Sequence, residues 1–351
     1  MTPRAGALIQ AAHQLALGAA AVEAMRELAD RGVASLLLKG PAVARRLYPD
    51  DPTRRTYCDV DLLVSPPTFA AAEGVLADLG YRPTIEGARP GDSWWHAHSW
   101  FRPGPVRIEI DLHRSFTGVR NHQRFWDVLW STRDQLVLGG TPVAVPSAPG
   151  AALLLALHAA SPGGSSKPGT ELQMALDAFG DDLWVEAAEV AREIGSEPAF
   201  AVGLCLSPPG QALAARLHLS SAGTPVEWLR AHSASRSASA LADLAAHPSL
   251  VARARHVWRR LRPSAAFLRH TSPLARRGRL GLTLAYAGRL GSLLVGAPAG
   301  AYELWVATRT MRGTSRGPAH RSPPPSPRPR DRPRLGVARR GRRRCPNGRL
   351  R

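Results

Sequence analysis

The N-terminal part of the chain alternates between helical and extended hydrophobic patterns. Over residues 5–30, apolar side chains recur every three or four positions, which predicts an amphipathic helix. Residues 34–38 form a short apolar run that ends in Lys-Gly-Pro, and residues 57–64 alternate apolar and acidic side chains. Both runs have the length and apolar content of buried strands. Helices over residues 42–47 and 66–79 follow the two strands, each introduced by proline.

A second extended pattern precedes a long helical region. Residues 94–101 and 105–113 alternate and are separated by Arg-Pro-Gly, which predicts a β-hairpin. Residues 127–145 have no clear period and contain one candidate strand near Leu136. From residue 149 onward the period is helical, with predicted helices over residues 151–160, 170–179, 183–194, 199–206, 228–247, 251–261 and 280–294.

These patterns predict an α+β fold in three parts. Residues 1–148 form a small mixed β-sheet domain flanked by helices, including the N-terminal helix. Residues 149–312 form an all-helical domain. Residues 313–351 are rich in Pro, Arg and Ser and have few apolar side chains to bury, so we expect a disordered tail.

Charge is concentrated in this tail. The chain has 46 Lys and Arg against 27 Asp and Glu, a formal net charge of +19. From Arg312 to Arg351 there are 14 Arg and one acid, which gives +13 and leaves +6 for the remainder. Arginines neutralise phosphates without reading sequence, so one hypothesis is salt-sensitive contact with nucleic acid or another anionic surface, lost when residues 314–351 are deleted. The alternative is an extension with no binding role.

The apolar pattern does not indicate a membrane segment. The N-terminal apolar stretch is Ala-rich, has a helical period and runs into Glu23 and Glu27, unlike a signal peptide. The longest late apolar run, residues 290–302, is shorter than the about 20 residues that span a bilayer. We therefore expect no membrane span and a cytoplasmic location.

Acidic side chains share one face of two predicted strands. Strand side chains alternate, so Asp59 and Asp61 point to one face while their apolar neighbours point to the other. Glu109, Asp111 and His113 repeat this phase in the later strand. Buried carboxylates repel each other unless a cation lies between them, although a single pair at a solvated sheet edge is the plain alternative. If the two strands are neighbours, three or four acids converge, and this set of oxygen ligands suits Mg²⁺.

The turn after the first strand is a candidate phosphate site. Gly40 lets the backbone approach a phosphate, and Lys39 adds a full positive charge. The N-terminus of the next helix lies at the same turn and is itself an anion-binding site. Arg54 and Arg55 come shortly before Asp59 and are candidates to reach a triphosphate. A strand-ending turn and a solvated arginine pair are the alternatives for these two features.

The order of these motifs resembles the uncharacterised nucleotidyltransferase family of the DNA polymerase β-like superfamily. The similar segments, within about residues 5–310, are a strand with Lys-Gly, a helix with Leu-Tyr-Pro, Asp-Val-Asp-Leu-Leu-Val, a helix ending Leu-Gly-Tyr, and Ile-Glu-Ile-Asp-Leu-His. In the helical part, His158, Lys167 and Asp177 are similar to the family's His…Lys…Asp stretch. The resemblance implies a nucleotidyltransferase-like fold for residues 1–148 and an NTP as substrate.

The resemblance also implies a reaction. Asp59 and Asp61 bind metal and Asp111 is the third catalytic carboxylate, with Glu109 as the other candidate for that place. With two Mg²⁺ or Mn²⁺ ions, an acceptor attacks the α-phosphorus of the NTP and pyrophosphate leaves. The implied acceptor is a small molecule, a peptide or a protein.

Basic residues and histidines complete the predicted site. The predicted nucleotide-binding residues are Lys39, Gly40, Arg55 and Lys167. His113 is a candidate for positioning the acceptor or Asp111, or else a capping or core histidine. His158 lies on a Leu- and Ala-rich helix and is more typical of a core histidine. An aromatic group either stacks on a base or packs within the hairpin; its members are Trp94, Trp95, His96, His98 and Trp100.

One departure leaves a second function open. The wider superfamily usually has Gly-Ser where this chain has Lys39-Gly40, so the serine contact to phosphate is absent. The chain is therefore either a transferase in which Lys39 replaces that contact by its charge, or a nucleotide-binding module that no longer catalyses. Mg²⁺-dependent NTP turnover separates these two hypotheses.

Overall fold

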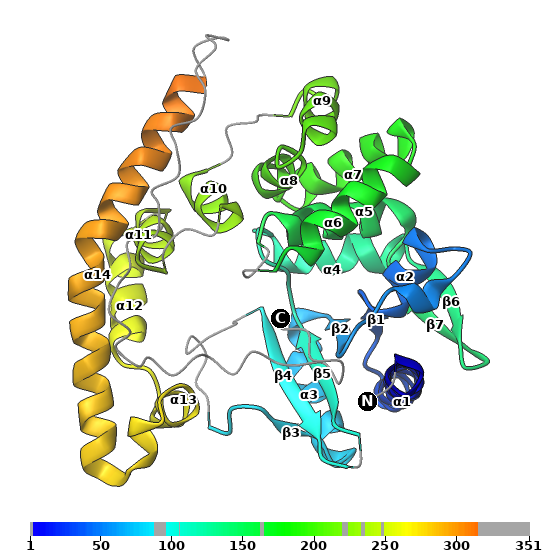
Figure 1. Ribbon diagram of the computed structural model, residues 1–351, viewed down its shortest axis with the longest axis horizontal. Coiled ribbons are helices and arrows are strands. Elements are labelled where there is room, and N and C mark those ends of the chain that lie inside the picture. Colours follow the sequence, from blue (N-terminus) through cyan, green and yellow to red (C-terminus); the bar gives the residue numbers. More distant parts are fainter. Residues whose placement is uncertain are drawn as a thin grey trace.

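The computed structural model describes residues 3–87, 96–104, 106–161, 165–219, 224–232, 236–246 and 249–314. A five-stranded sheet with helices on both faces forms the N-terminal part, and most of the rest is helical (Figure 1). This confirms the predicted α+β class. Residues 315–351 lie outside the described residues, so the disorder of the basic tail stays a prediction.

The sheet is mixed, as predicted. Its strands in spatial order are β1 (Ser35–Leu37), β2 (Val60–Val64), β5 (Ile108–His113), β4 (Ala97–Arg102) and β3 (Arg82–Pro83). β2 and β5 run parallel, whereas the other neighbouring strands are antiparallel. The predicted strands and hairpin are confirmed. The two-residue β3 is too short to leave a period in the sequence.

The two faces of the sheet pack against different helices. α1 (Pro3–Asp30) and α3 (Phe69–Asp78) cover one face, where Leu62, Ile110 and Leu112 are fully buried. On the other face, Leu63 belongs to a second core that includes helices later in the chain. Because this second core contains residues from both sides of residue 148, the helical part packs directly on the sheet.

Residues 114–147 contain a helix that the sequence pattern does not predict. α4 (His122–Ser131) begins after Asn121, whose side chain accepts a hydrogen bond from the Arg124 N–H at 3.0 Å. Residues 127–131, which have no clear period in the sequence, are the end of this short helix. A hairpin of β6 (Asp134–Leu138) and β7 (Thr141–Val145) follows, which confirms the strand near Leu136.

Short elements and a group of helices complete the part of the chain around the sheet. They are α2 (Pro41–Leu47), η1 (Pro52–Arg54), η2 (Pro66–Thr68), α5 (Ala148–Ala159), α6 (Lys167–Ala178), α7 (Asp181–Glu193), α8 (Glu197–Leu204) and α9 (Pro208–Arg216). α8 lies very close to α5, because a Cβ atom added at Gly203 would overlap the Ala156 carbonyl oxygen. The sequence pattern does not predict α9.

The last helices form small cores of their own. They are α10 (Pro225–Ala231), α11 (Arg236–Ala246), α12 (Leu250–Leu261), α13 (Ala265–Thr271), η3 (Leu274–Arg276) and α14 (Gly278–Thr314). Within α14, the segment Gly278–Arg309 is long and apolar enough to cross a membrane, judged by length and composition alone. The apolar run over residues 290–302 is thus the middle of a longer apolar helix. The short run in the sequence does not indicate how far this helix extends.

Candidate active site

Two acidic strands lie side by side at the centre of the sheet. In the parallel pairing of β2 and β5, Asp61 lies opposite Asp111 and Leu63 lies opposite His113. The alternate residues of both strands are in the core with α1 and α3, so the acids share the opposite face, as predicted. Asp59 and Asp61 are 3% and 5% exposed. The fold therefore brings the acids of two distant segments onto one face.

Asp61 is held by two neighbours. Its Oδ1 atom accepts a hydrogen bond from Lys39 Nζ at 3.0 Å and lies 3.0 Å from His113 Nε2. β1 brings Lys39 to this point, because β1 pairs with β2 and the Leu38 N–H donates to the Asp61 carbonyl. A buried carboxylate is stable only with such partners. Lys39 therefore compensates the charge of Asp61 in this structure.

Aromatic rings contact Lys39 and His113. The Lys39 ammonium lies 5.2 Å from the centroid of the Phe116 ring, and the His113 ring stacks on the same phenyl group at 6.1 Å. His158 meets Phe116 edge-on at 6.4 Å. The Nδ1 atom of His113 is buried and has no hydrogen-bond partner among the described residues. The two histidines predicted from sequence thus belong to one cluster.

Positive charge gathers around His96, directly before β4. The pKa of His96 is lowered to about 3, chiefly by burial and also by the nearby charges of His113, Lys39, Arg230 and Arg114. Cations that disfavour a charged imidazole favour an anion at the same place. No sequence pattern points to Arg230, which lies on the distant helix α10. The only signal for Arg114 is its position directly after the acidic strand.

Asp111 and Glu109 are the two candidates for the third carboxylate. Asp111 lies in register with Asp61 on one side and with Ser99 on the other. Glu109 forms an ion pair with Arg107 at 2.8 Å. Among the described residues, no group of three His, Cys, Asp or Glu side chains is placed so that it could hold a metal ion. The donor chemistry, carboxylate oxygens on adjacent strands, fits Mg²⁺ or Mn²⁺.

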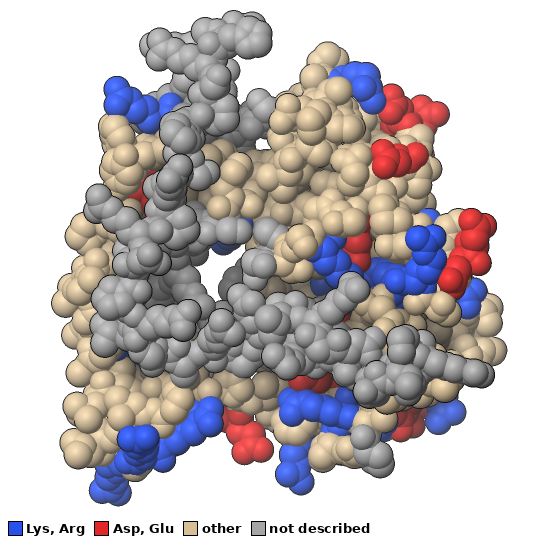
Figure 2. Space-filling model, in the orientation of Figure 1, with Lys and Arg blue, Asp and Glu red and all other residues tan. Residues whose placement is uncertain are grey.

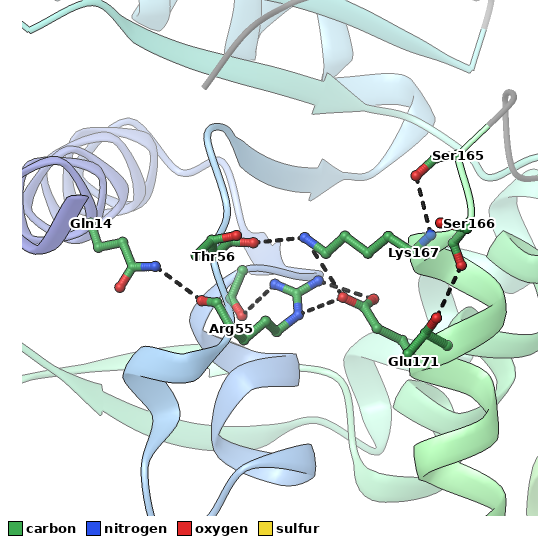
Figure 3. Close-up of polar contacts among 9 residues, drawn as sticks. Gln14, Arg55, Thr56, Ser165, Ser166, Lys167 and Glu171 are labelled. Atoms are coloured by element: carbon green, nitrogen blue, oxygen red, sulfur yellow. Dashed lines mark hydrogen bonds and ion pairs between the residues drawn. The ribbon is translucent and has the colours of Figure 1, made fainter. Parts of the chain in front are cut away.

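A buried ion pair ties the loop before β2 to α6. Arg55 donates from Nε and Nη2 to the two carboxylate oxygens of Glu171, at 2.9 and 3.2 Å (Figure 3). Its Nη1 atom donates to the Gly40 carbonyl at 3.0 Å. The side chains of Arg55 and Glu171 are 4% and 3% exposed. Such a two-point contact fixes both the position and the orientation of the guanidinium. The Arg55 side chain therefore points at Glu171.

Two further hydrogen bonds fix the same loop. Gln14 Nε2 donates to the Arg55 carbonyl at 3.0 Å, and Lys167 Nζ donates to the Thr56 carbonyl at 2.7 Å (Figure 3). Lys167 also lies 3.6 Å from Glu171. Arg55 and Lys167 thus have partners within the protein, and their contact with a nucleotide stays a prediction. Glu171 is not predicted from the sequence, where its only signal is its place one helical turn after Lys167.

Gly40 forms the turn that carries Lys39 into α2. Its φ of 58° is a conformation that favours glycine, and an added Cβ atom would lie 3.4 Å from the Tyr57 ring. Because the Gly40 carbonyl accepts from Arg55, the predicted phosphate turn and the loop before β2 are held together.

Two secondary candidates lie at the surface. Arg54 is exposed, and its guanidinium lies 5.8 Å from the centroid of the Tyr48 ring. Asp177 is exposed and accepts a hydrogen bond from Gln173 at 3.1 Å. Neither contact involves the acids of the sheet.

The predicted aromatic group is divided. Trp100 is buried in the core with α1 and α3, so it packs within the fold, as one of the two hypotheses expects. His98 lies 2.7 Å from Glu73 of α3. Trp94 and Trp95 lie outside the described residues.

Comparison with known proteins identifies the family. Residues 5–208 match the family described as Uncharacterised nucleotidyltransferase, which is more than half of the chain. The chain belongs to this family. The matched region contains both acidic strands, the turn at Gly40 and α6, and it ends where α9 begins. The resemblance drawn from the sequence motifs is therefore confirmed for residues 5–208, whereas its extension to about residue 310 stays a prediction.

Other comparisons add little beyond the family. No match was found among curated proteins. Among solved structures, an antigenic nucleotidyltransferase-like protein from Paracoccidioides brasiliensis is similar to this chain, with 18% identity and a TM-score of 0.31, over 53% of this chain and 91% of that protein. Membership of the family supports a general nucleotidyltransferase role, with an NTP as the class of substrate. Proteins of this family generally use divalent metal ions.

Proposed function

We propose that this chain transfers a nucleoside monophosphate from an NTP to an acceptor, at the sheet face that carries Asp59, Asp61 and Asp111. The observation that carries the proposal is the register of β2 and β5, which sets Asp61 opposite Asp111 on the face away from α1. In the transfer, an acceptor oxygen bonds to the α-phosphorus and the bond from that phosphorus to the bridging oxygen breaks. Pyrophosphate leaves, and the acceptor's proton passes to a base or to solvent.

The carboxylates have the metal-binding task in this proposal. Asp59, Asp61 and Asp111 would hold Mg²⁺ or Mn²⁺, and two bound ions supply activation of the acceptor oxygen and neutralisation of the triphosphate. The burial of Asp59 and Asp61 on one face supports this assignment, because two buried carboxylates there carry more negative charge than Lys39 alone offsets.

The basic residues have the phosphate-binding task. Lys39, hydrogen-bonded to Asp61 in this structure, supplies an ammonium close to the acids, and the cations around His96 extend the region that favours an anion. The Lys167 side chain is 34% exposed, and it would reach a phosphate by leaving its contacts with the Thr56 carbonyl and Glu171. Arg55 has an indirect part in this proposal: by binding Glu171 and the Gly40 carbonyl, it holds the loop that leads into β2.

The acceptor and the compartment are also part of the proposal. The proposed acceptor is a small molecule, a peptide or a protein with a free hydroxyl or phosphate oxygen. The proposed location is the cytoplasm, where NTPs are supplied.

Turnover of labelled NTPs by the full-length protein tests the proposal. With Mg²⁺ and a panel of acceptors, we expect label transfer together with pyrophosphate release. Asp61→Asn and Asp111→Asn should each lower the rate by about a hundredfold or more, because each removes a charged ligand. Glu109→Gln should have a smaller effect, since Glu109 pairs with Arg107, and Asp182→Asn, at an exposed position in the first turn of α7, is the control. Equal turnover by Asp61→Asn and the unaltered protein would contradict the proposal.

A second candidate function is nucleotide binding without transfer. The ion pair between Lys39 and Asp61 favours it, because the ammonium already neutralises a carboxylate that a metal would need. The lack of a ready three-residue metal site in the described part of the chain favours it too. This function predicts tight NTP binding without pyrophosphate release for every acceptor tried. Nucleic-acid contact through the tail concerns residues 315–351, outside the described part, and stays a prediction.

A further inference from the structure

Helix α14 exposes one apolar side along most of its length. Successive residues of an α-helix are turned by about 100°. By this geometry, six large exposed side chains fall on one arc of about 100°. They are Leu280, Leu284, Leu294, Val295, Tyr302 and Trp305, with exposed fractions of 74, 49, 67, 82, 65 and 53%. We call this arc the outer side of α14.

The inner side of α14 is docked on the protein. Ala285 and Ala307 are buried there, in the small cores shared with α13, α10 and α11. Cβ atoms added at Gly296 and Gly300 would lie 2.5 Å from Ser237 Oγ and 2.7 Å from the Ser237 carbonyl carbon. This close approach to α11 holds the helix against the molecule. Although α14 is apolar enough to span a membrane, spanning would break these contacts.

A helix that is apolar on all sides is normally buried on all sides. The outer side of α14 is a row of exposed apolar groups, which is typical of a surface that another body covers. Figure 2 shows this flank of the molecule as a largely tan surface, with basic side chains gathered at its lower end.

The surroundings of the outer side are basic. Residues 249–314 contain twelve arginines and one acid, Glu303. Arg277 and Arg279 are exposed at the start of α14. Near its other end, the guanidinium of Arg309 lies 4.9 Å from the centroid of the Trp305 ring. The sequence then continues over residues 315–351 with thirteen more arginines and one acid.

This charge pattern distinguishes the possible partners. A second copy of the chain would bring one arginine-rich helix end against another in either orientation, with a single acid to offset them. An anionic lipid surface offers a negatively charged headgroup layer over apolar acyl chains, which complements an apolar arc with arginines at both ends. Trp and Tyr side chains favour that boundary between water and hydrocarbon.

We propose that the outer side of α14 lies on an anionic lipid bilayer, with the helix parallel to the surface and its inner side still docked on α11. The inserted groups are the six apolar and aromatic side chains of the outer side. The arginines at the two helix ends contact the lipid headgroups. This surface lies outside the region shared with the family and does not depend on the proposed reaction.

Vesicle binding by the full-length protein tests this proposal. The probes are vesicles of phosphatidylcholine with and without phosphatidylglycerol, and the same vesicles carrying brominated acyl chains, which quench tryptophan emission on contact. We expect binding and quenching with the anionic vesicles. The double variant Leu294→Glu/Val295→Glu should lower the partition coefficient by about tenfold or more and remove the quenching. Val137→Glu, on β6 and 56% exposed, is the matched control and should change neither.

Several results would overturn the proposal. Vesicle binding without tryptophan quenching would mean that the basic tail alone contacts the lipid. Absence of vesicle binding, combined with a dimer that Leu294→Glu/Val295→Glu dissociates, would mean that a second copy covers the helix. Thermal unfolding of each variant checks that it is folded. Trp305→Phe adds a second readout, since it should keep vesicle binding and lower the quenching.

Discussion

Arg55 shows why residue type and local position do not settle a role. In the sequence it is one of two arginines shortly before Asp59, which favours a phosphate ligand. In the structure its guanidinium faces Glu171, a residue 116 positions away on α6. No spacing rule relates two positions so far apart, so only the packing of α6 beside the loop reveals the pair.

The buried pair of Arg55 and Glu171 should contribute strongly to stability. Breaking it from one side, with Arg55→Met or Glu171→Gln, should lower the free energy of unfolding by about 3 kcal/mol, because a buried polar group loses its partner. The double variant should lose less than the sum of the two single variants, since it leaves no unpaired charge. Denaturant titration of the four proteins measures this coupling.

The exposed ion pair of Arg216 and Asp181 provides the control. Its nitrogen–oxygen distance of 3.0 Å is close to the 2.9 Å of the buried pair, but its side chains are 55% and 66% exposed. Removing it should change the free energy of unfolding by less than about 1 kcal/mol. Strict additivity at Arg55 and Glu171 would show that their contact has no energetic weight.

His96 should make the protein less stable in acid. Burial lowers its pKa from 6.5 to about 3, so between these values the unfolded chain binds a proton that the folded chain does not. The stabilisation is complete above pH 6.5 and is lost as the pH falls toward 3, by about 1.4 kcal/mol for each pH unit. His96→Gln should flatten this slope in urea titrations between pH 7 and pH 4. An unchanged slope would contradict the assignment, and His232→Gln, at an exposed position, is the control.

At the scale of elements, periodicity predicts what has a long or regular pattern. The N-terminal helix, the two acidic strands and most helices after residue 149 are confirmed within a few residues. The elements missed are short: β3, α4, β7, α9 and α13. Their apolar positions are too few to establish a period, and they form because neighbouring elements already offer a surface to pack on.

The contact between α5 and α8 should not tolerate a larger residue at Gly203. The added methyl group of Gly203→Ala would overlap the Ala156 carbonyl oxygen, so the helices must separate, which should destabilise the fold by about 2 kcal/mol. Gly74 on α3 has open space around its Cβ position, so Gly74→Ala should stabilise the protein by about 0.5–1 kcal/mol. Thermal melts compare the two variants. A Gly203→Ala protein as stable as the unaltered one would show that the helices can part freely.

At the scale of the whole molecule, the sheet and helices α5 to α9 share one core. Leu36 and Leu63 of the sheet belong to the same cluster as Leu153 and Phe200. The predicted boundary at residue 148 therefore falls among segments that pack together, and the division into two domains there stays a prediction. The helices from α10 onward contact one another through much smaller cores.

Hydrogen exchange should show which parts open together. Amides of β2, α5 and α8 should exchange through one cooperative opening, because side chains of these three elements share a core. Amides of α11 and α14 should exchange at lower free energy, since few buried residues hold them. Native-state exchange with mass spectrometry measures both sets. Separate openings for the sheet and for α5 would contradict the single core.

The sequence predicts those features of the candidate site that depend on side-chain alternation within a single strand. Alternation alone places Asp59 with Asp61, and Glu109 with Asp111. The pairing of Asp61 with Asp111 depends on strand order, and the approach of Arg230 depends on the packing of a distant helix. These relations come from the assembled fold, so a single sequence contains no pattern for them.

The parallel pairing of β2 and β5 has a consequence for how such proteins diversify. Four ladder pairs, from Val60 with Ile110 to Leu63 with His113, set the spacing of the acids. The chain between the two strands, residues 65–107, leaves the sheet, builds α3 and returns through β4. Insertions and deletions there alter what surrounds the acids without altering the distance between them. In the proposed reaction, changes in this stretch would alter the surroundings of the acceptor while the strand pairing keeps the acids of β2 and β5 in register.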